Sequence, residues 1–96
     1  MTSVRHICGL VTEYFEITAA DLRRQDRRLP YVRPRQVAMY LARKYTRASL
    51  PVIGWRLRRD STTVLAGARR IAELRRCDPD LDLDVRDIEQ QLEGGR

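Results

Sequence analysis

Arginines and small polar residues between Ser49 and Leu65 are the side chains of this sequence best suited to hydrogen-bond another molecule. The segment is typical of a short helix, a tight turn that carries Arg58 and Arg59, and a second helix that begins after Asp60. A helix that presents such side chains in its first turn fits the major groove of DNA, where donors and acceptors on the base edges identify the sequence. We therefore predict a helix-turn-helix that binds double-stranded DNA.

Catalytic and metal-binding chemistry has few candidate residues in this chain. The only histidine is His6, and the two cysteines, Cys8 and Cys77, have no partner at the spacing of zinc ligands. The carboxylates between Asp78 and Glu93 lack the spacing of a calcium loop, and no Gly-x-x-x-x-Gly-Lys-Ser/Thr motif is present to bind a nucleotide. We therefore predict that the chain is not an enzyme and that it uses no metal, cofactor or small-molecule substrate.

The charges are segregated along the sequence. Of the 19 basic residues, 18 are arginine, and the segment from Arg23 to Arg76 holds sixteen basic and three acidic residues. The segment from Asp78 to Glu93 holds seven acidic residues and only Arg86 as a base. Arginine offers a planar fork of donors that matches phosphate oxygens and guanine edges. The basic segment thus favours a polyanion as partner, although a surface that only keeps the protein soluble is the alternative on charge alone.

The length and the apolar content predict a single domain. With 96 residues, 43% of them hydrophobic, the chain is expected to form one domain over residues 1–96, with its core between about residues 4 and 92. No apolar stretch is long enough for a signal peptide or a membrane span, and the arginines are too dispersed to form the basic face of a membrane-surface helix. We expect no membrane partner and a cytoplasmic, nucleoid-associated location.

Helical periodicity runs through nearly the whole chain, so the fold is predicted to be all-α, a compact domain of six helices. The first helix is expected over residues 4–15, followed by a short helix that Thr18 caps and that ends near Arg24. An exposed basic loop is expected over residues 25–31, and a third helix over 34–45 with Pro34 in its first turn. The remaining helices are expected over residues 49–57, after the cap Asp60, and from the break at residues 78–80 to the stop at Gly94 and Gly95.

Spacings of three and four residues give each predicted helix an apolar face. The predicted inward residues are Val4, Ile7, Cys8, Val11, Tyr14 and Phe15, then Val37, Ala38, Leu41 and Ala42, then Val64, Ala68, Ile71 and Ala72, and finally Val85, Ile88 and Leu92. The acidic side of the last helix is expected to face solvent, with a protein-docking face or an intramolecular mask over the basic surface as alternatives.

Four ordered motifs give the chain a specific family resemblance over about residues 4–92. They are YFEI at 14–17 with DL at 21–22, RPRQVAMYL at 33–41, SLPVIG at 49–54, and RDSTTVL at 59–65 followed by RRI at 69–71. In these motifs the chain resembles the C-terminal DNA-binding domain of the bacterial chromosomal replication initiator family, DnaA. The resemblance implies a regulator of replication initiation or transcription, either as a stand-alone protein or as a domain of a longer initiator.

The resemblance also implies which residues contact DNA. The helix after Asp60 enters the major groove, and the loop before the third helix places Arg27 in the adjacent minor groove, whose narrow A·T-rich form attracts a guanidinium. The positions that face bases in the family are occupied here by Arg27, Pro51, Asp60, Ser61, Thr62, Thr63 and Ala66. The positions that hold phosphates are occupied by Arg35, Gln36, Arg43, Thr46 and Ser49, to which the turn arginines Arg58 and Arg59 are expected to add contacts.

The chain departs from the family pattern in the recognition helix. Ser61 and Ala66 stand where the family has histidines, and the turn after Gly54 is one residue shorter than the family's common form. Shorter side chains lose base contacts that are each worth about 1–3 kcal/mol of discrimination, so an altered or relaxed base preference is predicted. The alternative is a non-enzymatic adaptor that contacts replication-initiation proteins and binds DNA weakly or not at all. Trp55 is left open between a partly exposed lid on the core and a contact to the DNA backbone.

Overall fold

Six helices make up most of residues 2–94, the part of the chain that the computed structural model describes. They are α1 (Val4–Phe15), α2 (Ala19–Leu22), α3 (Leu29–Tyr45), α4 (Leu50–Leu57), α5 (Ser61–Leu74) and α6 (Pro79–Gly94). No β-strand occurs within this part of the chain, so the prediction of an all-α fold with six helices is confirmed. The last helix was predicted to stop at Gly94 and Gly95, and Gly95 lies outside the described residues.

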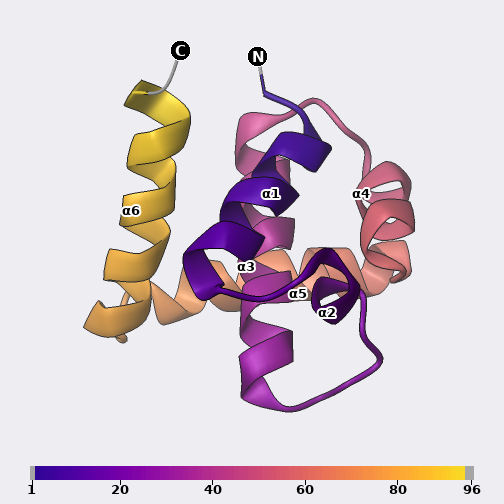
Figure 1. Cartoon of the computed structure of the whole chain (residues 1–96), viewed down its shortest axis with the longest axis horizontal. Helices are drawn as coiled ribbons and strands as arrows, with labels where there is room; N and C mark the ends of the chain where they lie inside the picture. Colours follow the sequence, from indigo (N-terminus) through magenta and orange to yellow (C-terminus); the bar gives the residue numbers. More distant parts are fainter. Residues whose placement is uncertain (1, 95–96) are drawn as a thin grey trace.

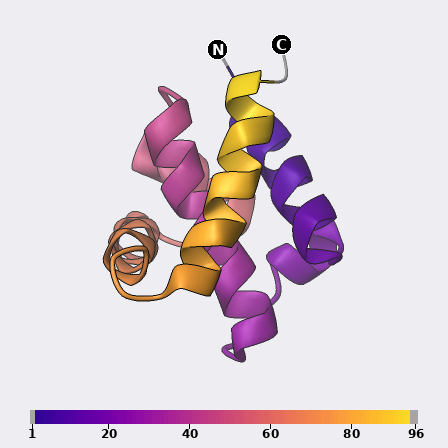
Figure 2. The same ribbon diagram turned by 90° about the vertical axis from the view of Figure 1, so that its left-hand side faces the viewer.

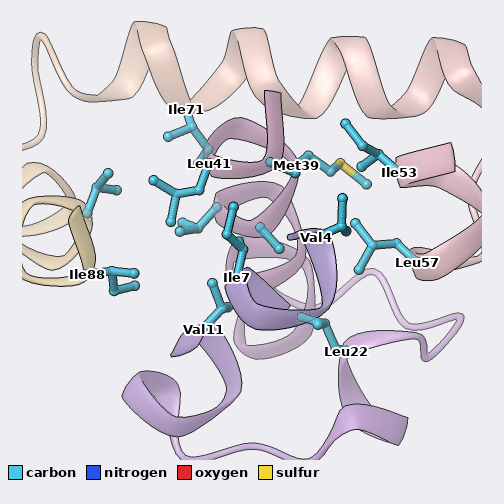
Figure 3. Close-up of a cluster of buried hydrophobic side chains, with 14 of the residues drawn as sticks. Val4, Ile7, Val11, Leu22, Met39, Leu41, Ile53, Leu57, Ile71 and Ile88 are labelled. Atoms are coloured by element: carbon cyan, nitrogen blue, oxygen red, sulfur yellow. The ribbon is translucent and has the colours of Figure 1, made fainter. Parts of the chain in front are cut away.

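The central helix is α3, which crosses the middle of the molecule (Figure 1). α5 and α1 pack on α3, and α4 packs on α5 to complete the helix-turn-helix. α6 covers the side of the molecule on which α1 and α3 lie (Figure 2). Figure 3 shows the core that these contacts enclose. Its largest fully buried side chains come from five helices and include Ile7, Met39, Leu41, Ile53, Leu57, Ile71 and Ile88.

α2 is a single turn whose start is fixed by its own side chains. The Thr18 hydroxyl accepts a hydrogen bond from the Asp21 amide at 3.0 Å, and the Asp21 carboxylate accepts one from the Thr18 amide at 3.1 Å. This reciprocal capping box satisfies two amides that have no partner within the helix. The predicted cap is confirmed, and it sets the point at which the basic loop leaves α2.

α3 starts five residues earlier than predicted, at Leu29, so the expected start at Pro34 is wrong. Pro30 occupies the first turn, where a missing amide costs little, and Pro34 lies inside the helix. Either proline suits the first turn of a helix, so the sequence does not show which of them marks the start. In the structure the turn that begins at Leu29 is continuous with the rest of α3. The basic loop is therefore shorter than the predicted 25–31, and Tyr31 is part of α3.

The predicted apolar faces are correct with one exception, because Ala72 is exposed. The inward stripe of α5 continues from Ile71 to the half-buried Leu74, which is the next position at helical spacing. Gly67 is also buried. It lies so close to α3 that a Cβ there would overlap the Met39 sulfur. α5 therefore packs on α3 along a buried face that begins at Val64 and includes Gly67 and Ile71 but not Ala72.

The acidic residues of α6 do not simply face solvent, as had been expected. Glu89 is 7% exposed and accepts hydrogen bonds or ion pairs from Lys44 Nζ at 2.7 Å and from Arg75 Nη1 at 3.1 Å. Asp82 accepts from Arg75 Nε at 2.6 Å, and Asp84 accepts from the Tyr14 hydroxyl at 2.7 Å. Within residues 2–94, none of the α6 carboxylates is paired with a predicted DNA contact. These carboxylates dock α6 on α1, α3 and α5 and do not mask the predicted DNA surface.

Candidate nucleic-acid interface

α4 ends in a tight turn that fixes where α5 begins. The Arg59 amide donates to the Gly54 carbonyl at 2.8 Å and the Arg58 amide donates to the Trp55 carbonyl at 3.4 Å, which is the Schellman arrangement of a helix C-terminus. Arg58 has φ 58° and ψ 47°, in the left-handed region that glycine adopts at least cost. Gly54 lets the turn fold back, because a Cβ there would overlap the Arg59 carbonyl oxygen. The turn thus requires a glycine inside α4 and holds an arginine in a conformation that suits glycine.

Replacing Arg58 by glycine is expected to raise the free energy of unfolding by about 0.5–1 kcal/mol. The left-handed conformation costs an L-residue about 1–2 kcal/mol, and glycine removes that cost. Part of the gain is lost because glycine has more conformational freedom in the unfolded chain. Urea denaturation measures the change. Arg56→Gly, in the helical part of α4, is the control and is expected to lower stability by up to about 1 kcal/mol. An Arg58→Gly protein no more stable than the parent would show that the Arg58 side chain itself stabilises the turn.

The first turn of α5 presents the predicted base-facing residues. The Asp60 carboxylate accepts a hydrogen bond from the Thr63 amide at 2.8 Å, so the predicted cap is confirmed. This backbone hydrogen bond lowers the pKa of Asp60 and keeps the carboxylate ionised. Thr62, Thr63 and Ala66 are exposed and Ser61 is half-buried. The hydroxyl and methyl groups of the predicted reading face therefore lie at the surface.

The end of α3 and the start of α4 bring several predicted phosphate contacts together. Arg43 is exposed, and the Thr46 hydroxyl donates to a carbonyl of the last turn of α3 at 2.6 Å. The Ser49 hydroxyl caps α4, and Pro51 is exposed in the first turn of that helix. Gln36 is half-buried about two turns before Arg43 and accepts a hydrogen bond from Arg33 Nη1 at 2.8 Å. Of these side chains, Arg43 offers the exposed positive charge.

The loop between α2 and α3 carries three exposed arginines, two of which have partners within the loop region. Asp26 accepts from Arg28 Nη2 at 2.8 Å and from the Arg28 amide at 2.9 Å, and it lies 3.7 Å from Arg24 Nε. The hydrogen bonds from Arg28 hold the pKa of Asp26 well below its usual range. The same two guanidinium groups lie over the Tyr31 ring, 4.5 Å and 5.5 Å from its centroid. Arg27 is exposed, and its side chain makes no hydrogen bond or ion pair within residues 2–94.

Two predicted phosphate contacts, Arg35 and Arg59, are engaged by the protein itself. Arg35 is only 6% exposed and donates to the carbonyls of Arg24 at 2.9 Å and Asp26 at 3.1 Å. Arg59 donates to the same Arg24 carbonyl at 2.6 Å. Burial lowers the pKa of both guanidinium groups. Arg35 therefore lies beneath the loop and not among the exposed phosphate-contact candidates, and its phosphate contact stays a prediction.

An open pocket of about 550 Å³ lies beside the turn. Its lining residues are Arg23, Gly54, Trp55, Arg56, Arg58, Arg59 and Asp60. Trp55 is 79% exposed, so it is not a lid on the core, and its contact to a DNA backbone stays a prediction. The sequence did not single out Arg23 and Arg56, because they lie far apart in the chain and only the packing of α2 near α4 brings them to one pocket. The pocket adds cationic surface next to the helix-turn-helix.

Residues 2–94 hold no group of three or more histidine, cysteine, aspartate or glutamate side chains that is arranged to bind a metal ion. In the same residues, no helix combines the length and the apolar character needed to cross a membrane.

Comparison with known proteins identifies relatives of this fold. Residues 4–71 match the family described as "Bacterial dnaA protein helix-turn-helix". Over 93 residues the chain is 45% identical to the chromosomal replication initiator protein DnaA of Azoarcus sp. (strain BH72), a match that covers 96% of this chain and 19% of that protein. The DnaA protein of Ruegeria sp. (strain TM1040) is 45% identical, and the match covers 95% of this chain and 20% of that protein. The DnaA protein of Zymomonas mobilis is 43% identical, and the match covers 96% of this chain and 19% of that protein. The chain spans about a fifth of the length of these relatives.

Proposed function

Because this chain belongs to the family of bacterial DnaA helix-turn-helix domains, we propose that it binds double-stranded DNA through α4 and α5. The first turn of α5 enters the major groove, where Asp60, Ser61, Thr62, Thr63 and Ala66 face base edges and Pro51 contacts a thymine methyl. Arg27 enters the adjacent minor groove. The process served is the regulation of replication initiation or of transcription, at the nucleoid in the cytoplasm.

The observation that carries the proposal is that the Arg27 loop lies against the helix-turn-helix. Arg59 in the turn is 2.6 Å from the Arg24 carbonyl of the loop, so the two groove-reading elements are neighbours at the surface. Major and minor grooves are adjacent on a duplex, and a protein that reads both needs its two reading elements side by side. Arg43 and the start of α4 add contacts to phosphates, which position the protein without reading the sequence.

The base preference is proposed to differ from that of the family. Ser61 and Ala66 offer one hydroxyl and one methyl group at positions where longer polar side chains read bases in the family. Phosphate contacts from Arg43 and Arg58 do not depend on sequence, and their share of the binding energy rises when base contacts are lost. The expected result is a lower ratio of specific to nonspecific affinity.

Fluorescence anisotropy with duplex DNA tests the proposal, combined with selection of bound sequences from a random duplex pool. Binding is expected at low ionic strength, and the logarithm of the association constant is expected to fall linearly with the logarithm of salt concentration. The selected sequences report the preferred site, and A·T enrichment beside it is expected from Arg27. Absence of salt-sensitive binding at low ionic strength would exclude this function.

Replacing Arg43 by alanine is expected to weaken binding by about the same factor on every duplex. A side chain that contacts only phosphate carries no base information, and losing one such contact reduces the salt slope by about 0.9. Anisotropy titrations on the selected duplex and on an unrelated duplex, each at several salt concentrations, measure both effects. Arg86→Ala removes the same charge from α6 and serves as the control. A loss confined to the selected duplex would assign Arg43 to base recognition.

A second candidate function is that of an adaptor for replication-initiation proteins. The exposure of Trp55 beside Arg23 and Arg56 favours it, because tryptophan and arginine are enriched among the residues that dominate protein–protein binding. The partner is expected to present an acidic surface to this pocket. Recovery of a replication-initiation protein by the nuclease-treated parent chain and not by Trp55→Ala, together with no DNA binding, would support this candidate against the first.

A further inference from the structure

One loop carbonyl receives two arginines from different parts of the chain. The Arg24 oxygen accepts Arg35 Nη1 at 2.9 Å and Arg59 Nη2 at 2.6 Å. Arg35 comes from α3 and also donates to the Asp26 carbonyl at 3.1 Å. Arg59 comes from the turn between α4 and α5 and also donates to the Arg58 carbonyl at 2.9 Å. These contacts connect the loop, α3 and the helix-turn-helix turn at a single point.

The charges at this contact point to a role for Arg35 and Arg59 other than stabilising the fold. Neither Arg35 nor Arg59 forms an ion pair with a carboxylate within residues 2–94, and the two positive charges repel each other. Burying a charge is costly, and at Arg35 the loss of water is offset by two loop carbonyls and by attraction to the Asp26 carboxylate. The two guanidinium groups join the loop carbonyl to α3 and to the turn between α4 and α5. The guanidinium fork holds its donors apart in a rigid plane, so each arginine reaches separate carbonyls, whereas a lysine presents its three donors at a single nitrogen.

Two of the three loop arginines have partners within residues 2–94, and the third does not. Asp26 engages Arg24 and Arg28, and both of these guanidinium groups lie over Tyr31. Arg27 lies between them in sequence and is exposed. With the backbone held at Arg24 and Asp26, the direction in which Arg27 leaves the loop is set relative to the start of α5.

We infer that Arg35 and Arg59 are positioning residues that lock the Arg27 loop to the helix-turn-helix turn, so that the two groove-reading elements bind DNA as one rigid unit. The inference rests on the proposed function. It assigns to both residues a role different from the phosphate contact predicted from the sequence, which the family resemblance implies for Arg35 and the position in the turn suggested for Arg59. The main cost of binding with a flexible loop is the entropy lost on ordering it, and a loop that is ordered in the free protein avoids that cost.

The first test needs no DNA and uses Arg59→Lys, which keeps the charge and removes the fork. ¹⁵N relaxation of the loop amides, such as those of Gln25 and Arg27, is measured in the free full chain. The order parameters are expected to fall from about 0.85 in the parent towards 0.6 or below in the variant. Arg58→Lys is the matched control, since it makes the same change one residue earlier and its side chain does not contact the loop. Unchanged order parameters in Arg59→Lys would overturn the inference.

The second test is a double-mutant cycle with Arg27→Ala on the selected duplex. Arg59→Lys alone is expected to weaken binding about tenfold, and this loss is expected to vanish once Arg27 is absent. Additive losses, or full affinity in Arg59→Lys, would make Arg59 a phosphate contact and overturn the inference. If the parent chain binds no duplex, the proposed function fails, whereas the order parameters of the free protein still decide whether Arg59 holds the loop.

Discussion

Gly54→Ala is expected to lower the free energy of unfolding by about 2–3 kcal/mol, the upper range for overpacking of a tight contact. The added Cβ overlaps the Arg59 carbonyl oxygen, which is backbone and has no rotamer to escape into. The turn must therefore open, and the hydrogen bond from the Arg59 amide to the Gly54 carbonyl is strained with it. For a domain of this size the melting temperature is expected to fall by about 10–20 °C. DNA affinity is expected to fall as well, because the turn sets the position of Asp60 and of the loop.

Gly9→Ala provides the matched control within the same chain. Gly9 lies in α1, and a Cβ there meets no other atom within 4 Å. The variant is expected to gain about 0.5–1 kcal/mol, since alanine has the better helix propensity. Thermal and urea denaturation of both variants separate the two effects. Equal stability changes at the two positions would contradict the close approach of the turn to α4.

Arg27→Ala is expected to weaken binding to an A·T-rich duplex by roughly tenfold to a hundredfold, which corresponds to about 1–3 kcal/mol. The narrow minor groove of such DNA has an enhanced negative potential, and a guanidinium inserted there gains more than one on the outside of the duplex. On a G·C-rich duplex the loss is expected to be smaller, because that groove is wider and carries a guanine amino group. Anisotropy titrations on a pair of duplexes with the same core site and different flanks measure the difference.

Arg43→Ala is the comparison variant, because its loss is expected to be the same on both duplexes. The Arg27 side chain makes no hydrogen bond or ion pair within residues 2–94, so its removal should leave the melting temperature nearly unchanged. Equal losses from Arg27→Ala on the A·T-rich and G·C-rich duplexes would reject the minor-groove assignment.

Helix starts were predictable because their signals are local. Thr18, Ser49 and Asp60 each bond an amide within their own first turn, and the sequence alone shows both partners. The start of α3 was not predictable in this way, since Pro30 and Pro34 both suit a first turn. The exposure of Ala72 depends on how α5 crosses α3, which is a tertiary property.

The candidate site was predictable where residues share one helix and not where the fold joins distant segments. Asp60, Thr62 and Ala66 lie at the surface of one helix, as their spacing indicates. No sequence pattern indicates that Arg35 and Arg59, which are 24 positions apart, meet at one carbonyl. A count of arginines treats every guanidinium as available to a partner, and only burial and hydrogen bonding separate those used internally from those that are free.

The pairing of the α6 carboxylates has a consequence for how the protein meets a polyanion. α6 carries six acidic residues and one arginine, and its pairs with Lys44 and Arg75 hold it on the opposite side of the molecule from α4 and the α2–α3 loop (Figure 1). The net charge of +6 is therefore unevenly distributed, with sixteen of the 19 basic residues between Arg23 and Arg76 and seven acidic residues between Asp78 and Glu93. Such asymmetry turns a protein before collision and raises the association rate, most strongly at low ionic strength, where the field reaches furthest. How the protein is oriented when it meets the polyanion, more than its total charge, then sets the fraction of collisions that become bound complexes.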